Sequence, residues 1–177
     1  MKKLHLGCGS VILPGYTNID LYNDKADLQQ DVSKLNFADK SVDLIYACHI
    51  LEHFNRNEYF NILTEWVRVL KIGGKIRLSV PSFESIVEHY TKHHNIDLLQ
   101  GLLNGGQTDK WNHHNTMFDK NKLTNDFKKL KCHNVKEWDW RRTSHAEFDD
   151  FSQAYLPHMD KDNGILMSLN LEATRWK

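Results

Sequence analysis

The sequence predicts an α/β fold with a doubly wound, mostly parallel sheet. Short apolar segments alternate with segments of helical periodicity, which is the pattern of repeated β–α–β units. The first apolar segment, Lys3–Leu6, runs directly into Gly7-Cys8-Gly9, and a second ends in the acid Asp20. The 177 residues hold no long polar linker and match the length of one domain with a sizeable core.

The first half of the chain is expected to hold five strands. They are 3–6, 16–20, 26–31, 42–48 and 75–80, the last stopped by Pro81. Between the fourth and fifth strands, apolar residues from Tyr59 to Leu70 recur at helical spacing. This spacing predicts a helix that Asn57 caps and Gly73-Gly74 end.

The second half is expected to be less regular. Helices are predicted at 84–93 and 122–130, strands at 134–140 and 165–173, and a short amphipathic helix around residues 148–155. Residues 82–121 are interpreted as an insertion or lid, and residues 141–163 as a second long connection. Both interrupt a single sheet, so we expect one domain spanning residues 1–177.

Charge and composition exclude several classes of protein. Lys plus Arg and Asp plus Glu both number 23, so no basic excess favours nucleic acid or a membrane surface. The apolar segments are too short to span a bilayer, and the N-terminus has no signal-peptide pattern. The three cysteines form no Cys-x-x-Cys pair, which disfavours a zinc ribbon or a disulfide framework. We expect a cytoplasmic protein.

The glycine loop and the first acid suggest a nucleoside site. Glycines without a Cβ let the backbone approach a ligand closely. A carboxylate at the tip of the next strand, here Asp20, accepts hydrogen bonds from the two hydroxyls of a ribose. Such a pair belongs at the carboxyl edge of a parallel sheet.

Six phrases, in this order and spacing, resemble a class I S-adenosylmethionine-dependent methyltransferase. They are Leu4–Ser10, Asn18–Asp20, Asp31–Ser33, Val42–Tyr46, Ile50–His53 and Arg68–Gly74. The resemblance implies a Rossmann-like sheet of seven strands, the last antiparallel. Later phrases resemble a small bacterial subgroup associated with polysaccharide or surface-sugar biosynthesis. These are Gly105–Gln107, His113-His114, Phe118-Asp119, Pro157–Asp160 and Ser168–Asn170.

The family resemblance also implies roles in cofactor binding. The loop should pass beneath the methionine part of S-adenosylmethionine. Asp20 should bind the ribose hydroxyls, and Asp31 should accept a hydrogen bond from the adenine amino group. The backbone of Val32 should meet the adenine ring, and Cys48 and His49 should lie near the sulfonium and the acceptor. The full predicted set is Gly7, Cys8, Gly9, Ser10, Asp20, Leu21, Asp31, Val32, Cys48 and His49.

The first third of the chain departs from the family pattern. Pro14-Gly15 stand where the first crossover helix would run, and Asp20 and Asp31 are too close for a full second one. One side of the sheet edge is therefore expected to be thinly covered. Its apolar surface would suit a partner subunit, which makes a homodimer an expectation.

Methylation of a hydroxyl requires a base, and histidine has a suitable pKa. The predicted catalytic residues are His113, His114 and His49, with Asp119 near enough in sequence to orient an imidazole. The predicted substrate contacts are Trp111, Arg141 and His158. No metal site is predicted, because adjacent histidines seldom face the same point.

The sequence thus predicts an S-adenosylmethionine-dependent methyltransferase that releases S-adenosylhomocysteine. Its acceptor would be a small molecule or a glycan precursor, attacked through an oxygen. Two alternatives stay open: a C- or N-methyltransferase of another metabolite, and a non-catalytic S-adenosylmethionine-binding partner of another enzyme. A dinucleotide enzyme is disfavoured, because the loop lacks the third glycine of that fingerprint.

Overall fold

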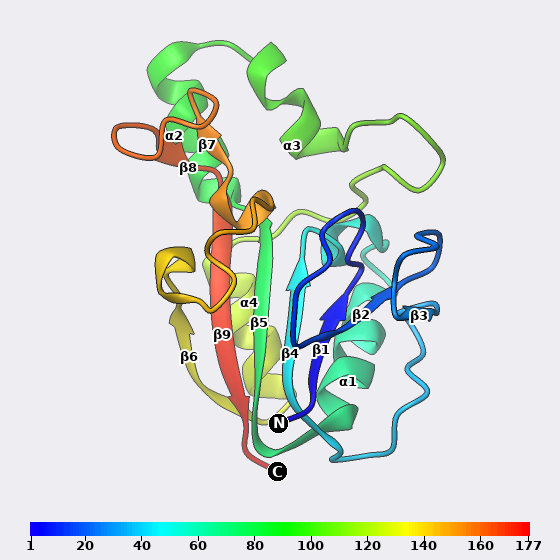
Figure 1. Cartoon of the computed structure of the whole chain (residues 1–177). Coiled ribbons are helices and arrows are strands. Elements are labelled where there is room, and N and C mark those ends of the chain that lie inside the picture. Colours follow the sequence, from blue (N-terminus) through cyan, green and yellow to red (C-terminus); the bar gives the residue numbers. More distant parts are fainter.

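A seven-stranded sheet forms the centre of the molecule in the computed structural model, which describes all residues 1–177 (Figure 1). The strand order is β3-β2-β1-β4-β5-β9-β6, and only β9 runs antiparallel to its neighbours. The strands are β1 (Lys3–Leu6), β2 (Thr17–Asp20), β3 (Leu28–Gln29), β4 (Val42–Cys48), β5 (Leu70–Pro81), β6 (Cys132–Glu137) and β9 (Ser168–Arg175). The predicted fold class is confirmed.

Two helices, α1 (Tyr59–Val69) and α4 (Lys120–Lys129), cover one face of this sheet (Figure 1). Their apolar stripes bury Leu63, Trp66 and Phe127 completely against the sheet, in the main core cluster. The helical spacing seen in the sequence thus correctly marks the buried face of α1.

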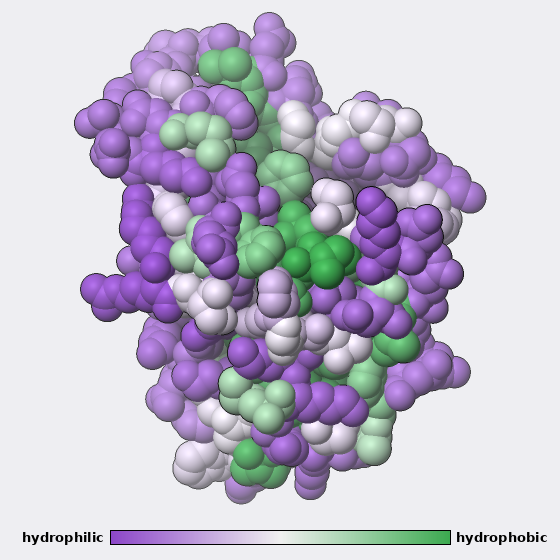
Figure 2. Space-filling view, viewed as in Figure 1, coloured by the Kyte–Doolittle hydropathy of each residue, from purple (hydrophilic) through white to green (hydrophobic).

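The opposite face of the sheet carries no long helix. A smaller cluster covers it, formed by the loop after β1 and the segment after β6; its buried members are Leu13, Tyr16, Leu44, Tyr46 and Trp138. Figure 2 views this face, which is mostly hydrophilic with apolar atoms gathered near its middle. On this face the buried Glu172 pairs with two partly exposed cations, Arg77 at 2.7 Å and Lys75 at 3.0 Å.

The short crossovers in the first third leave exposed apolar side chains at the β2–β3 edge. Leu21, Tyr22 and Leu28 are all exposed there. The central part of the same face, by contrast, is closed by the chain's own segment after β6. The homodimer stays a prediction.

The carboxyl ends of the parallel strands lie beneath residues 82–121, at the end of the molecule away from both termini (Figure 1). This segment contains α2 (Phe83–His93), η2 (Asp97–Leu99) and α3 (Gln100–Asn104). The paired strands β7 (Tyr155–Leu156) and β8 (Ile165–Leu166) stand at the same end. The remaining 3-10 turns are η1 (Leu51–His53), η3 (Trp140–Arg142) and η4 (Phe151–Gln153).

Two predictions about α1 are wrong. Its N-cap is Glu58 rather than Asn57, and no side chain bonds to the free amides there. The helix ends at Val69, and Gly73-Gly74 lie inside β5. The pairing with β4 shifts register there, and a Cβ on Gly74 would lie 2.9 Å from the Lys71 carbonyl oxygen. The two glycines therefore permit a bulge in β5 instead of ending a helix.

Four other predicted elements have different bounds or types. The strand 26–31 shrinks to two residues, and the strand 134–140 ends at Glu137, since Asp139 caps the turn η3. The amphipathic helix around 148–155 is only the turn η4, followed directly by β7. The strand 165–173 is split, because Met167 donates its amide to Ala154 and the chain changes partner. No helix has the length and apolar character to cross a membrane.

Candidate active site

The glycine loop after β1 has the backbone geometry predicted for it. Gly7 and Gly9 have φ angles of +62° and +51°, in the left-handed region that favours glycine. A Cβ on Gly7 would lie 2.7 Å from Cγ1 of Ile50, whereas a Cβ on Gly9 would meet open space. The loop is thus packed against the segment after β4 on one side and open on the other.

Asp20 fixes the open side of the loop to the tip of β2. Its Oδ2 accepts the amide of Gly9 at 2.9 Å, and its Oδ1 accepts the amides of Tyr22 at 2.9 Å and Asn23 at 3.0 Å. Oδ2 keeps a lone pair, because a carboxylate oxygen accepts two hydrogen bonds. The carboxylate therefore both shapes the loop and retains capacity for a ribose hydroxyl.

The second predicted acid lies just beyond β3. Asp31 is exposed, and its carboxylate accepts the amide of Ser33 at 2.8 Å. Val32, beside it, is buried, and its carbonyl accepts the indole Nε1 of the buried Trp66 at 2.8 Å. Helix α1 thus anchors the segment predicted to meet the adenine.

Trp111 approaches the same end of the site from above. Its ring lies 5.4 Å from that of Tyr22, the residue after the exposed Leu21. A residue predicted to contact substrate therefore lies next to the predicted cofactor residues. Segment 105–116 thus reaches the β2 tip through Trp111 and the turn after β4 through the amides of Asn115 and Thr116, which donate to the Glu52 carbonyl.

His49 follows β4 with a φ of +48°, and its side chain is only 7% exposed. The Ser168 hydroxyl donates to the carbonyl of Phe151, so His49 Nε2 must donate to Ser168 Oγ, at 2.8 Å. This assignment leaves Nδ1 without a proton. Nδ1 lies 3.3 Å from Oε1 of Glu52.

Glu52 is the centre of a buried group that we call the His–Glu cluster: His49, Glu52, His53 and His114. The Glu52 side chain is 1% exposed, and neither of its oxygens forms a hydrogen bond. His114 Nε2 lies 3.9 Å from Oε1 of Glu52, and the rings of His53 and His114 are 4.9 Å apart.

Burial sets the charge of this cluster. It raises the pKa of Glu52 to about 8 and lowers the pKa of His49 to about 3. It also lowers the pKa values of His53 and His114. Since a buried charge is costly, the four groups are mostly neutral near pH 7. The imidazoles are therefore in the form that can accept a proton or bind a metal ion.

Cys48, predicted near the sulfonium, faces the other way. It packs with the smaller cluster on the opposite face of the sheet, and burial raises the pKa of its thiol well above the ordinary value. All three cysteines are free.

The other predicted residues do not join the cluster. Asp119 is the N-cap of α4, accepting the amide of Lys122 at 2.6 Å, so the prediction that it orients an imidazole is wrong. His113 contributes its carbonyl, which accepts His53 Nδ1 at 3.1 Å. Arg141 donates to the carbonyl of Lys161 at 2.9 Å, and His158 is exposed in the β7–β8 connection.

Three residues of the site were missed in the sequence: Glu52, His53 as part of a cluster, and Ser168. A signal for the first two was present. His49, Glu52 and His53 have the spacing of one helical turn directly after a buried strand. His114 and Ser168 could not be joined to them from local spacing, because they lie 62 and 116 residues further along the chain than Glu52.

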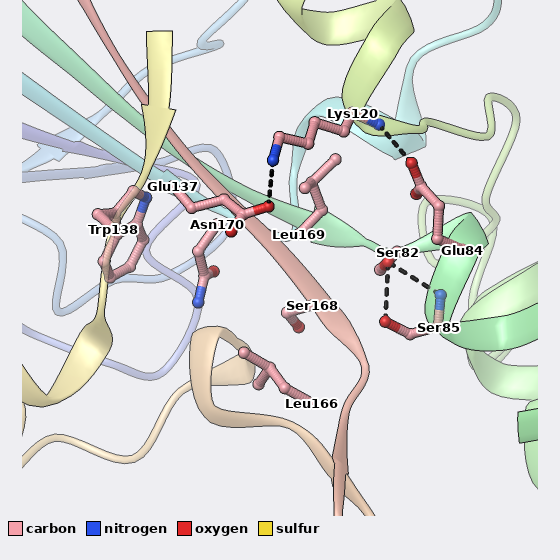
Figure 3. Close-up of a pocket in the computed structure, with 10 residues that line it drawn as sticks. All are labelled: Ser82, Glu84, Ser85, Lys120, Glu137, Trp138, Leu166, Ser168, Leu169 and Asn170. Carbon is pink, nitrogen blue, oxygen red and sulfur yellow. Dashed lines mark hydrogen bonds and ion pairs between the residues drawn. The ribbon is translucent and has the colours of Figure 1, made fainter. Parts of the chain in front are cut away.

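A hollow of about 320 Å³ lies on the far side of β5 from the glycine loop (Figure 3). Hydroxyls of Ser82, Ser85 and Ser168 line it, together with Asn170. Lys120 closes one side: its Nζ lies 2.9 Å from Glu137 Oε1, and its amide donates to Glu84 at 3.0 Å. No residue of the glycine loop lines this hollow, and it meets the His–Glu cluster only through Ser168.

Comparisons with known proteins agree with the fold. A family model described as a methyltransferase domain matches residues 18–78, about a third of the chain. No curated protein matches the chain by sequence.

Solved structures are similar in fold at low identity. One is an S-adenosylmethionine-dependent methyltransferase from Methanosarcina mazei, 18% identical, with a TM-score of 0.60 over 99% of this chain and 93% of that one. Another is the 1,6-didemethyltoxoflavin-N1-methyltransferase of Burkholderia thailandensis, 12% identical, with a TM-score of 0.57 over 99% and 71%. That enzyme was solved with 1,6-didemethyltoxoflavin and S-adenosylhomocysteine bound.

A third similar structure is a putative methyltransferase of Haloferax volcanii, solved in complex with a methyltransferase activator. It is 18% identical, with a TM-score of 0.57 over 99% of this chain and 83% of that one. The sheet topology is that of the class I methyltransferase fold, and the matched methyltransferase domain lies within this sheet. The matched methyltransferase domain agrees with the predicted enzyme class, and S-adenosylmethionine, the predicted cofactor, is the one named for the Methanosarcina structure.

Proposed function

We propose that the protein transfers the methyl group of S-adenosylmethionine to an oxygen of a small molecule or a glycan precursor. The observation that carries the proposal is the His–Glu cluster beside the glycine loop. Ile50 connects the two, since it packs against Gly7 and stands between His49 and Glu52 in the chain. Buried groups that can take a proton therefore lie next to the expected cofactor loop.

S-adenosylmethionine supplies an activated methyl carbon when it is bound. The residues of the chain must then align the acceptor, exclude water and remove the hydroxyl proton as the new C–O bond forms. His49 Nδ1 is the best-placed acceptor for that proton, because its Nε2 is fixed on Ser168. Glu52 Oε1 lies 3.3 Å from this nitrogen, so an ionised Glu52 would stabilise the imidazolium that forms when His49 takes the hydroxyl proton.

Two features support the acceptor class. The hydroxyl-lined hollow of Figure 3 suits a ligand with several hydroxyls, and Ser168 connects it to His49. The phrases Gly105–Gln107 and His113-His114, on which the resemblance to the surface-sugar subgroup rests, lie in the segment above the site. N-methylation is the alternative favoured by the named activity of the Burkholderia enzyme.

Isothermal titration calorimetry tests the cofactor half of the proposal. S-adenosylmethionine and S-adenosylhomocysteine should bind, and NAD should not. Asp20→Ala should weaken binding by about ten- to a hundredfold, because hydrogen bonds to a charged group contribute about 1.5–3 kcal/mol. Asp24→Ala, an exposed acid in the same loop, is the matched control. Equal affinities of Asp20→Ala and Asp24→Ala would refute the assigned cofactor site.

Turnover with a panel of hydroxylated and nitrogen-containing acceptors tests the chemistry. His49→Ala and His114→Ala should lower kcat. The kcat of His49→Ala should also depend more steeply on pH than that of the wild type. His94→Asn is the control, because His94 is exposed and its left-handed backbone tolerates asparagine. Full activity of both cluster variants would exclude a histidine base, and turnover of amines alone would favour N-methylation.

A further inference from the structure

We propose that Glu52, His53 and His114 form a binding site for a divalent transition-metal ion of the zinc type. One ligand atom from each of the three residues lies within 4.8 Å of the other two. Two residues come from the turn after β4, and the third comes from segment 105–116 above it. The site would thus join the sheet to the segment that covers its carboxyl edge.

The two histidines are already held in the form that a metal needs. His53 Nδ1 donates to the carbonyl of His113 at 3.1 Å, and His114 Nδ1 donates to the carbonyl of Leu102 at 2.8 Å. In a neutral ring, these bonds leave the Nε2 of each histidine unprotonated. Metal-binding histidines characteristically donate their other ring N–H to a carbonyl or carboxylate in this way.

The carboxylate of Glu52 is the second, independent observation. It is almost fully buried, yet neither oxygen has a hydrogen-bond partner. The other buried acids are satisfied: Asp126 accepts from Tyr59 and Lys129, and Glu172 pairs with Arg77 and Lys75. Burying an unpaired carboxyl group is unfavourable, and a bound cation would provide the missing partner.

The donor set limits which ion fits. Two imidazoles and one carboxylate suit zinc and its neighbours among the transition metals, whereas magnesium and calcium prefer oxygen ligands only. Zinc–nitrogen bonds of about 2.0–2.1 Å place tetrahedral ligands roughly 3.3 Å apart. The 3.9 Å between His114 Nε2 and Glu52 Oε1 would close to that value with a small side-chain rotation.

Segment 113–116 is fixed well enough to keep this geometry. The amides of Asn115 and Thr116 both donate to the carbonyl of Glu52, at 2.8 and 3.2 Å, and the amide of His114 donates to Asn104 at 3.1 Å. Three protein ligands leave one position open for an oxygen, as in zinc enzymes. An acceptor hydroxyl would take that position beside His49; this last role rests on the proposed function, whereas metal binding does not.

The test is metal binding by the full chain after treatment with a chelator and dialysis. Titration with Zn²⁺ should show one tight site, and Co²⁺ should give the visible absorption of a nitrogen- and oxygen-ligated ion. Glu52→Gln and His114→Ala should each weaken Zn²⁺ binding by about a hundredfold or more, since even loss of an outer partner of a ligand costs 10- to 100-fold. His94→Asn should bind like the wild type.

Absence of stoichiometric Zn²⁺ or Co²⁺ binding by the wild type would overturn the proposal. Unchanged binding in both cluster variants would also overturn it, because the ion would then occupy another site. Absence of the Co²⁺ absorption in the wild type overturns the proposal even if a variant does not fold. Calorimetry with S-adenosylmethionine on the same preparation separates the two proposals: cofactor binding without metal binding overturns only the metal site, and the reverse overturns only the cofactor site.

Discussion

Replacing Gly7 by alanine should damage both the fold and the site, because two separate costs meet at this residue. Its φ of +62° lies in the left-handed region, and a Cβ there would approach Cγ1, Cδ1 and Cβ of Ile50 to 2.7, 2.8 and 3.0 Å. Rotation of the Ile50 side chain cannot relieve the contact with its own Cβ. The backbone between His49 and Glu52 would have to move.

The size of the effect follows from these two costs. A left-handed conformation costs a residue with a Cβ about 1–2 kcal/mol, and overpacking a tight contact costs about 1–3 kcal/mol. The lower entropy of the unfolded alanine chain returns about 0.4–1 kcal/mol. Gly7→Ala should therefore lower the free energy of unfolding by about 2–4 kcal/mol. Gly9→Ala has the φ cost but no clash, and should lower it by about 1 kcal/mol or less.

Urea unfolding of four proteins measures these terms: Gly7→Ala, Gly9→Ala, Ile50→Ala and the double variant Gly7→Ala/Ile50→Ala. Removing Cγ1 and Cδ1 of Ile50 should relieve the two closest contacts and leave only the one with Cβ, so the double variant should be more stable than the sum of the single effects by about 1–2 kcal/mol. Equal destabilisation by Gly7→Ala and Gly9→Ala, with strictly additive effects of Gly7 and Ile50, would refute the close contact between the cofactor loop and the turn after β4.

Two further predictions concern groups outside the cluster. Burial lowers the pKa of His5 to about 4, below its value of 6.5 in the unfolded chain. The unfolded chain therefore binds the proton more readily. The free energy of unfolding should fall as the pH drops from 6.5 towards 4. The share of this loss due to His5 should approach 3 kcal/mol by about pH 4. His5→Gln should lack that share and keep the loss due to His49, whose pKa is also lowered. Urea unfolding across this range measures both, and parallel profiles of the wild type and His5→Gln would contradict the prediction. Trp66→Phe removes the donor to the Val32 carbonyl and should lower the free energy of unfolding by about 2–4 kcal/mol. Calorimetry should also show weaker binding of S-adenosylmethionine. An unchanged unfolding midpoint would count against that hydrogen bond.

The parts of the fold that the sequence predicted are those controlled by local periodicity and by the rule for parallel sheets. The apolar stripe of α1 identified its buried face, and the predicted strand 75–80 is part of the core strand β5. Gly73-Gly74 were misread because the same dipeptide can end a helix or form a bulge. Only the pairing with β4, a contact outside the local sequence, distinguishes the two.

The glycine loop with Asp20 could be predicted from the sequence, whereas the His–Glu cluster could not. Gly7, Gly9 and Asp20 lie at the ends of adjacent strands, so strand order alone brings them together. The cluster needs His114, and the position of His114 depends on hydrogen bonds from segment 113–116 back to Glu52. Local periodicity does not encode such a return of the chain. Asp119 therefore looked in the sequence like a partner for a nearby imidazole, whereas in the structure it caps helix α4.

The turn after β4 explains why these two halves should act together. His49 adopts a left-handed φ of +48°, a conformation that costs a non-glycine residue energy and persists only where the surroundings compensate. Its amide donates to the carbonyl of Ser79 at 2.8 Å, and its ring is held by Ser168. The sharp turn places Ile50 against Gly7 and directs Glu52 into the interior. Any shift of the glycine loop on binding a nucleoside would therefore move the residues that we propose hold the acceptor.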